Sequence, residues 1–254
     1  MQQYKAIISD IDGTLTSKMT KDDLYPLPSK KVLQAINKAK GKMHFVLATS
    51  RSLPYTNYLL DCLLLTSPYI VQNGAIIVDG KTKKILWEKQ IYQNDLLRVI
   101  EYFLKKKLSF VIDERDKTGI TFTKNYVPHN PLNIFVSELT DKQAKEVEHD
   151  LSDISTIAMH KVTSWTQTKW GFNITNAEVS KQHAVLEIAK ILNISTEEMI
   201  GIGDGYNDFP LLMACGFKVA MGNAVTELKA IADYIAPSID QDGVADVIKK
   251  FILV

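Results

Sequence analysis

The sequence predicts an α/β protein with a doubly wound parallel sheet, into which a smaller α+β module is inserted. Short apolar runs alternate with helical periods over the first fifty residues and again over the C-terminal third, an order typical of parallel sheets with crossover helices, and we expect the sheet domain to comprise residues 1–85 and 178–254. Between them, residues 86–177 show two rounds of a helix followed by strands with short turns. This second order of elements indicates an antiparallel sheet with helices on one face.

The first half of the predicted parallel sheet comes from residues 5–48. Apolar runs at 5–9 and 43–48 predict two buried strands. Pro28-Ser29 begins a helix between them, and Gly41 closes it. Such a strand–helix–strand unit is expected to be parallel, with a right-handed crossover. The apolar positions of its helix are Val32, Leu33, Ile36 and Ala39.

The remaining elements follow from the same periodicities. In the C-terminal part we expect helices at 181–192, 210–214, 226–232 and 244–251, and strands at 199–203, 218–221 and 234–236. In the inserted module we expect helices at 94–107 and 141–152, and strands at 109–113, 119–123, 133–137, 154–160 and 169–175.

The composition excludes several classes of protein. The 30 Lys and Arg residues against 29 Asp and Glu leave a net charge of +1, which gives no overall attraction for nucleic acid or anionic lipid. No uncharged apolar run approaches the roughly 18 residues that span a bilayer, and no signal peptide is visible. We therefore expect a cytoplasmic protein without nucleic-acid or membrane partners. Cys62 and Cys215 are expected to be buried free thiols.

The most informative motif, Asp-Ile-Asp-Gly-Thr, follows the first predicted strand. Asp10 and Asp12 project to the same side of an extended segment, at the end of a parallel strand where open α/β sheets bind ligands. A simple turn would also use Asp and Gly here, but two neighbouring carboxylates repel each other unless a cation joins them. We therefore interpret the pair as functional.

A second acidic cluster, Gly-Ile-Gly-Asp-Gly-Tyr-Asn-Asp, lies at 201–208 after another apolar strand. A dinucleotide-binding loop would need a third glycine where Tyr206 stands, so that interpretation fails. The carboxylates of Asp204 and Asp208 suit Mg²⁺, which prefers oxygen ligands. In isolation the same cluster could be a capping turn.

Two weaker signals accompany these motifs. Thr49, Ser50 and Arg51 end the second predicted strand, where small hydroxyls serve equally well in an anion site or a helix cap. Lys181 begins a predicted helix, where most lysines are merely solvated and a cation opposes the helix dipole.

Other reaction classes find no support in the sequence. The five histidines show no zinc-ligand spacing, and there is neither a Gly-x-Ser-x-Gly elbow nor a phosphate-binding P-loop. We expect Trp87, Trp165 and Trp170 to pack in the core or in a cleft of the inserted module.

Four elements, taken together and in this order, resemble the haloacid dehalogenase superfamily of phosphatases. They are the Asp-Ile-Asp-Gly-Thr motif, a threonine after the second strand, a lysine after the insert, and the cluster at 201–208. The segments Val-Gln-Asn-Gly-Ala at 71–75 and Val-Ala-Met-Gly-Asn-Ala at 219–224 resemble its Cof-type hydrolases. The resemblance implies a Rossmann-like core with an α+β cap of the C2, or IIB, type. It also implies Mg²⁺-dependent hydrolysis of small phosphate monoesters, sugar phosphates above all, through an aspartyl-phosphate intermediate.

The resemblance assigns roles to the acidic residues. Asp10 is expected to attack phosphorus, and Asp12 to protonate the leaving group and later deprotonate water. Asp10, the backbone carbonyl of Asp12 and Asp204 are expected to bind Mg²⁺. Asp208 is expected either to supply a further ligand or to support the others.

The resemblance also implies that Thr49 and Lys181 bind the phosphoryl oxygens of the substrate. The further candidates for contact with phosphate or substrate are Gly13, Ser50, Arg51 and Asn207.

The sequence departs from the Cof-type pattern at two places near these residues. Glu178 and Gln182 replace glycines around the lysine, and Ser50 replaces the glycine of Thr-Gly-Arg. Neither departure removes a charged group.

Two other functions remain open at this point. A phosphomutase or phosphotransferase of the same fold would pass the phosphoryl group to a second hydroxyl, and a regulatory protein would bind a phospho-ligand without hydrolysing it. The insert is expected to determine substrate choice. The sequence predicts neither the natural substrate, nor the insert residues that contact it, nor the oligomeric state.

Overall fold

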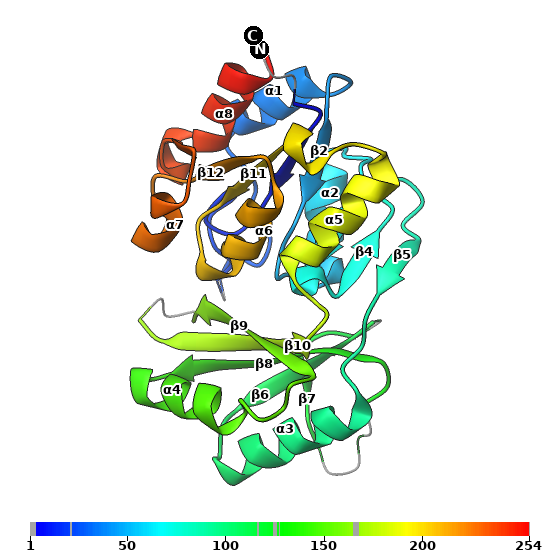
Figure 1. Cartoon of the computed structure of the whole chain (residues 1–254), viewed down its shortest axis with the longest axis vertical. Coiled ribbons are helices and arrows are strands. Elements are labelled where there is room, and N and C mark those ends of the chain that lie inside the picture. Colours follow the sequence, from blue (N-terminus) through cyan, green and yellow to red (C-terminus); the bar gives the residue numbers. More distant parts are fainter. Residues whose placement is uncertain are drawn as a thin grey trace. The chain divides into compact units, whose positions relative to one another are not determined.

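The computed structural model describes residues 4–20, 22–115, 117–123, 126, 128–164 and 168–253 (Figure 1). Its internal contacts divide the chain into two compact units. The first, here called the core unit, comprises Met1–Leu86 and Ser180–Val254. The second, here called the insert, is Trp87–Val179. The boundaries expected from the sequence were 85/86 and 177/178.

The core unit is built on a five-stranded parallel sheet in the order β13-β12-β11-β1-β2. Its strands are β1 (Ala6–Ser9), β2 (His44–Leu47), β11 (Met199–Gly203), β12 (Phe217–Ala220) and β13 (Tyr234–Ile235). β1 lies between β11 and β2, with Ile8 paired with Gly201 on one side and Val46 on the other. All of β1 is buried, and burial on both faces explains its nearly continuous apolar sequence.

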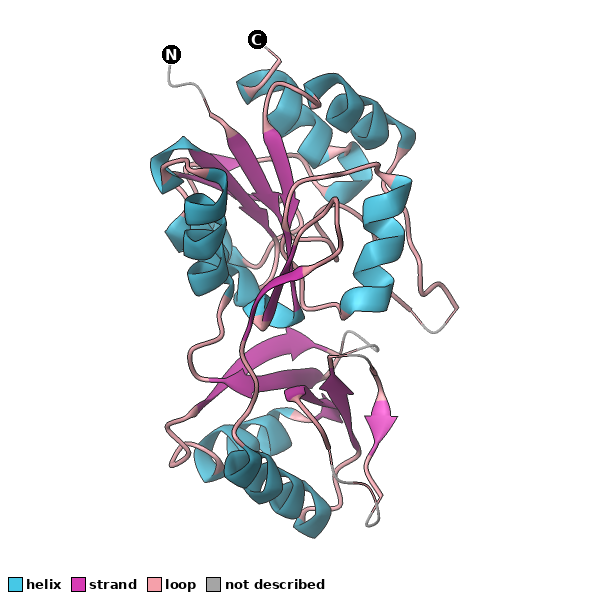
Figure 2. Ribbon diagram, turned by 90° about the vertical axis from the view of Figure 1, so that its right-hand side faces the viewer, coloured by secondary structure: helices cyan, strands magenta, loops and turns pink. Residues whose placement is uncertain are grey.

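Helices cover both faces of this sheet (Figure 2). On one face α1 (Lys30–Ala39) packs against α8 (Gly243–Phe251), and on the other α5 (Lys181–Leu192) packs against α6 (Phe209–Ala214). Ser29 caps α1 by accepting a hydrogen bond from the N–H of Val32 at 3.2 Å. The short α7 (Thr226–Ala230) joins β12 to β13. The doubly wound α/β class is therefore confirmed.

The segment from the end of β2 to the first residues of the insert contains elements that the sequence did not predict. These are α2 (Leu53–Cys62), β3 (Tyr69–Val71), the 3₁₀ turn η1 (Gln72–Gly74), β4 (Ile76–Val78) and β5 (Ile85–Glu88). The three strands form a small sheet in the order β3-β4-β5. A parallel bridge between Ala48 and Ile70 links this sheet to the end of β2. Strands of three residues are too short to show an alternating pattern.

The two cysteines are free, but only one of them is buried. Cys215 is enclosed behind β11, and burial raises the pKa of its thiol to about 12. Cys62 ends α2 and is exposed, so the prediction that both thiols are buried is wrong for Cys62. An apolar run of sequence around a residue does not say which side of a helix that residue occupies.

The insert is an antiparallel sheet in the order β7-β6-β8-β10-β9 with two helices on one face (Figure 1). Its elements are α3 (Gln93–Lys105), β6 (Phe110–Glu114), β7 (Ile120–Thr121), β8 (Pro131–Leu139), α4 (Asp141–Asp150), β9 (Ile157–Thr163) and β10 (Trp170–Asn176). Phe103 of α3 packs in one core with Ile134 of β8 and Phe172 of β10. The strand expected at 119–123 is only two residues long, and Trp165 lies outside the described residues.

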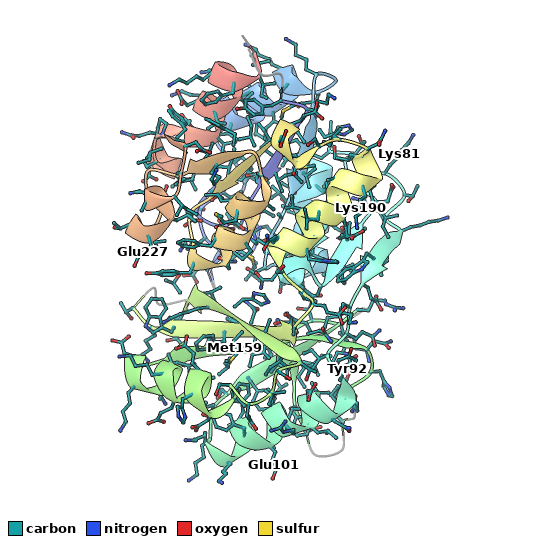
Figure 3. All side chains as sticks on the ribbon, viewed as in Figure 1. Lys81, Tyr92, Glu101, Met159, Lys190 and Glu227 are labelled. Carbon is teal, nitrogen blue, oxygen red and sulfur yellow. The ribbon has the colours of Figure 1, made fainter. Side chains whose placement is uncertain are left out.

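Charged side chains lie on the outer surface of both units. Lys190 on α5 and Glu227 on α7 project from the core unit, and Glu101 on α3 projects from the insert (Figure 3). Among the described residues, no helix is both long and apolar enough to cross a membrane.

Candidate active site

The carboxyl ends of β1 and β11 bring the two acidic motifs together. Because these strands are parallel neighbours, the residues that follow them, Asp10 and Asp204, emerge at the same edge of the sheet. Asp208 follows in the 3₁₀ turn η3 (Tyr206–Asp208). One carboxylate oxygen from each of the three residues lies within 4.8 Å of the others, and all three residues are buried.

Lys181, the first residue of α5, reaches into this acidic cluster. Its Nζ donates hydrogen bonds to Oδ1 of Asp10 and Oδ1 of Asp208, both at 2.6 Å, and its side chain is only 1% exposed. Ser180 caps the helix by accepting a hydrogen bond from the N–H of His183 at 3.1 Å. The sequence signal for Lys181 is weak, because only the fold places this lysine beside residues so distant in the chain.

The cluster carries more negative charge than Lys181 balances. Burial, and next the charge of Asp208, raise the pKa of Asp10 well above its ordinary value. The same two causes raise the pKa of Asp204 to about 7. Burial alone would lower the pKa of Lys181, but the adjacent Asp10 and Asp208 carboxylates outweigh it and raise that pKa. The lysine is therefore an ammonium ion among carboxyl groups that are hard to ionise together.

This excess of carboxylates fits a hard divalent cation. Such cations take oxygen ligands, and the cluster offers three buried carboxyl groups at one point. Among the described residues, a second ammonium group, that of Lys18, lies 3.9 Å from Asp204 Oδ2 on a side chain that is 37% exposed, so its charge is partly screened by water. A bound cation would favour the ionised carboxylates and so counteract both causes of the raised pKa values, the burial and the charge of Asp208.

The loop after β1 shapes the site around Asp204. Thr14 Oγ1 donates a hydrogen bond to Asp204 Oδ1 at 3.1 Å. Gly13 has a φ of +85°, and a Cβ there would lie 2.8 Å from Asp204 Cγ. The N–H of Gly13 is bonded to the carbonyl of Thr16 at 2.8 Å. Gly13, expected as a phosphate-binding residue, thus makes room for Asp204, whereas Thr14 is a site residue that the sequence analysis left out of its candidates.

Both oxygens of Asp208 are occupied by protein donors. Oδ1 accepts from Lys181, and Oδ2 accepts from the backbone N–H groups of Asp204 at 3.0 Å and Gly205 at 2.9 Å. These bonds orient the lysine and the loop that carries Asp204 at the same time.

The side chain of Asp12 lies outside the three-carboxylate group and is bound by Arg51. The Nε and Nη2 atoms of Arg51 donate to the two oxygens of Asp12, each at 2.8 Å, and the N–H of Met19 donates to Oδ1 at 3.0 Å. Arg51 is 3% exposed in this fork-like pair, and Asp12 is 24% exposed. Arg51 was expected to contact phosphate or substrate, and in this structure it binds Asp12. Ser50 beside it is half-buried.

Thr49 and Asn207 are joined through a third residue, Asn73. Thr49 is fully buried, and its Oγ1 accepts a hydrogen bond from the N–H of Arg51 at 3.0 Å. Its carbonyl accepts from the N–H of Asn73 at 3.0 Å, and Asn207 Nδ2 donates to Asn73 Oδ1 at 3.2 Å. In the sequence, Asn73 stood out only as part of the segment 71–75 that resembles the family, and no role was predicted for it.

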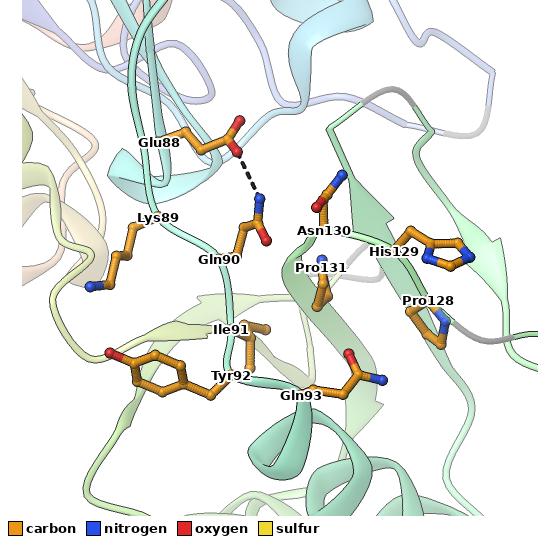
Figure 4. A pocket seen from close by; sticks show the side chains of 10 residues that line it. All are labelled: Glu88, Lys89, Gln90, Ile91, Tyr92, Gln93, Pro128, His129, Asn130 and Pro131. Atoms are coloured by element: carbon orange, nitrogen blue, oxygen red, sulfur yellow. Dashed lines mark hydrogen bonds between the residues drawn. The ribbon is translucent and has the colours of Figure 1, made fainter.

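The insert has a cavity of its own, of about 500 Å³ (Figure 4). Lys89 in its lining pairs with Glu178 at 2.7 Å, and Glu88 accepts hydrogen bonds from Gln90 at 2.8 Å and from Arg115. Charges in this lining are thus matched by neighbours within the insert. The lining residues that the structure describes therefore show no charge excess like that of the acidic cluster in the core unit.

Comparison with known proteins identifies the family. A family model described as haloacid dehalogenase-like hydrolase matches residues 7–150 and 116–248. The chain is 31% identical over 275 residues to a Streptococcus pyogenes protein with a provisional phosphatase name, covering 98% of each chain. It is 28% identical over 247 residues to a phosphoglycolate phosphatase of Methanopyrus kandleri, covering 97% of this chain and 96% of the relative. The chain therefore belongs to the haloacid dehalogenase-like hydrolases.

Solved structures show the same fold. A haloacid dehalogenase-like hydrolase from Bacillus subtilis superposes with a TM-score of 0.82 at 20% identity, covering 97% of this chain and 99% of that one. The subclass IIB sugar phosphatase BT4131 superposes with a TM-score of 0.79 at 23% identity, covering 98% and 100%. The family predicted from the motifs is confirmed, and so is the expected class, an enzyme of a hydrolase family whose relatives carry phosphatase names.

Replacing Lys181 by methionine tests the charge balance of the cluster. Lys181→Met leaves Asp10 and Asp208 buried without their cation, and we expect the metal-free protein to lose about 3–5 kcal/mol of unfolding free energy at pH 8. Because the raised pKa values of Asp10 and Asp204 make folding take up protons, stability should fall as pH rises, and the loss should shrink at pH 5. Urea unfolding in the presence of a chelator measures both values.

Lys190→Met is the matched control, because Lys190 lies exposed on the same helix (Figure 3). We expect it to change the unfolding free energy by less than about 0.5 kcal/mol at either pH. A loss for Lys181→Met that is the same at pH 5 and pH 8 would contradict the electrostatic account of the cluster.

Proposed function

We propose that this protein is a Mg²⁺-dependent phosphatase that hydrolyses small phosphate monoesters, including sugar phosphates, through an aspartyl phosphate on Asp10. The observation that carries the proposal is the buried group of Asp10, Asp204 and Asp208 around Lys181. A phosphate monoester is a dianion, so it approaches a carboxylate only where cations offset the repulsion. The phosphoglycolate phosphatase and sugar phosphatase among the similar proteins support this class of substrate.

The metal site would use residues of the core unit alone. Asp10, Asp204 and the backbone carbonyl of Asp12 would hold Mg²⁺, while Asp208 keeps Lys181 and the Asp204 loop in place through its three hydrogen bonds. When bound, the ion neutralises the negative charge of the phosphate and polarises its oxygens.

The chain's own residues divide the reaction into two displacements. Asp10 attacks phosphorus while the ester oxygen leaves with a proton from Asp12, and Thr49 and Lys181 hold phosphoryl oxygens. Asp12 then takes a proton from water, which cleaves the aspartyl phosphate and restores the carboxylate of Asp10 as phosphate departs. In this scheme Arg51 positions Asp12, because its two donors fix the plane of that carboxyl group.

The insert acts in this proposal as the cap that determines substrate choice. On the sheet face opposite its helices, Asn133 Nδ2 donates to Asp113 Oδ2 at 3.0 Å and to Asn173 Oδ1 at 3.1 Å. Such carboxyl and amide groups can exchange hydrogen bonds with the hydroxyls of a sugar. All three side chains are buried, so the support for hydroxyl-bearing substrates is the kind of group that this face carries and not an exposed surface.

Replacing Asp10 by asparagine tests the proposed nucleophile. The change is nearly isosteric and removes only the attacking charge, so phosphate release in saturating Mg²⁺ should fall by more than about 10³-fold. Equilibrium dialysis should show that the variant still binds the ester. Asp240→Asn, at an exposed acid of the same unit, should leave turnover unchanged. Residual turnover within tenfold of wild type would exclude Asp10 as the nucleophile.

Replacing Asp12 by alanine separates its role from that of Asp10. A sugar alkoxide leaves poorly without a proton, whereas p-nitrophenolate leaves readily as the anion. In single-turnover formation of the aspartyl phosphate, Asp12→Ala should therefore slow the best sugar phosphate by about 10²- to 10⁴-fold and p-nitrophenyl phosphate only mildly. Formation rates are compared because Asp12 also assists the later attack of water, which is common to both substrates. Equal slowing with the two substrates would exclude the acid role.

A further inference from the structure

Three consecutive residues between β3 and β4 have positive φ angles. Gln72, Asn73 and Gly74 adopt φ values of 50°, 56° and 106°. Residues other than glycine rarely occupy this left-handed region, although asparagine is enriched there. At Gly74 an added Cβ would lie 2.8 Å from the carbonyl carbon of Ser180, so only glycine fits. A left-handed conformation at residues other than glycine persists only where neighbouring contacts stabilise it. Such strained backbone is concentrated at functional sites.

The elements that hold this turn all belong to the active site of the core unit. The N–H of Asn73 bonds to the carbonyl of Thr49, and its Oδ1 accepts from Asn207 Nδ2. The next residue, Gly74, lies against Ser180, immediately before the lysine of the acidic cluster. The turn that carries Asn73 is therefore held by the threonine and acidic-loop motifs and by the residue before Lys181.

The side-chain amide of Asn73 retains a buried donor. Because Oδ1 accepts the bond from Asn207, the orientation of the amide is fixed and Nδ2 points away from that partner. Asn73 is 1% exposed, and its Nδ2 has no hydrogen-bond partner among the residues that the structure describes. Burying an amide donor without an acceptor is costly, so such a group in a native fold calls for an explanation.

We propose that Asn73 Nδ2 donates a hydrogen bond to a phosphoryl oxygen of the bound ester, beside Thr49 and Lys181. The ligand chemistry follows from the atom and its surroundings: a buried N–H requires an acceptor, and the motifs around it are the ones proposed above to bind phosphate. The left-handed turn holds the donor in place before the ligand arrives, so little ordering is required on binding. This inference rests on the proposed function and adds a binding residue to it.

Two substitutions at position 73 distinguish direct donation from a structural role. Asn73→Asp keeps the shape and the oxygen that accepts from Asn207, but it replaces the donor by a carboxylate oxygen. Asn73→Gly removes the whole amide and adopts positive φ freely. Direct donation predicts that inorganic phosphate, titrated calorimetrically in saturating Mg²⁺, binds about 10- to 100-fold more weakly to Asn73→Gly. It predicts a still larger loss for Asn73→Asp, because the new carboxylate repels the anion.

A merely structural role predicts the opposite order, since Asn73→Gly loses the Asn207 contact and Asn73→Asp retains it. The matched control is Asn193→Asp, at an exposed asparagine with φ of 52° that ends α5, and it should leave phosphate binding unchanged. Weaker loss in Asn73→Asp than in Asn73→Gly, or wild-type affinity in both, would overturn the inference while leaving the phosphatase intact. Failure of the wild-type protein to bind phosphate or release it from any ester would instead refute the proposed function.

Discussion

The contact between Lys181 and the two carboxylates of Asp10 and Asp208 is the interaction on which the rest of the site depends. Removing one ammonium and several carboxyl groups from water is unfavourable, and hydrogen bonds of 2.6 Å to each partner only partly offset this. In proteins generally, replacing a buried ion pair by hydrophobic residues of similar volume is often neutral or stabilising. The proposed chemistry of the site explains the arrangement: one fixed cation and an excess of carboxylates lie together where a second cation and an anionic substrate would bind.

Each structural feature near the cluster serves this arrangement. Neighbouring parallel strands deliver Asp10 and Asp204 to one edge of the sheet. Gly13 leaves space for the Asp204 carboxylate, and Thr14 binds it. Asp208 joins the lysine to the Asp204 loop. The site is thus assembled from segments at both ends of the chain, and its geometry follows from the register of β1 against β11.

The pairing of Asp12 with Arg51 keeps the two carboxylates of the first acidic motif apart. Two carboxylates separated by one residue would repel each other, and the structure divides them between different cations: Lys181 for Asp10 and Arg51 for Asp12. Each carboxylate is thereby held in a different orientation. In the proposed mechanism this division gives the two acids different tasks, nucleophilic attack for one and proton transfer for the other.

The sequence predicted the fold where periodicity is strong and local. The helix at 181–192 and the strand at 199–203 have the observed bounds, because an amphipathic helix and a buried apolar strand leave clear patterns. The hairpin at 69–78 was missed, since its strands are three residues long and its turn depends on left-handed backbone. The motifs indicated Asp10 and Asp204 directly. The partners of Arg51 and the buried amide of Asn73 depend on contacts between distant segments, which no local pattern records.

A calorimetric titration with Mg²⁺ tests the central claim, which has two parts. The acidic cluster binds a cation, and without that cation its Asp10 and Asp204 carboxyl groups resist ionisation. Performed at pH 6.5 in two buffers of different ionisation enthalpy, it measures both the ions bound and the protons released. The account predicts one Mg²⁺ per chain with net release of protons, because the pKa of Asp204 is raised to about 7 and that of Asp10 is also raised without the metal. It further predicts that Asp204→Asn weakens binding strongly. Absence of binding, or binding that releases no protons and is unaffected by Asp204→Asn, would contradict it.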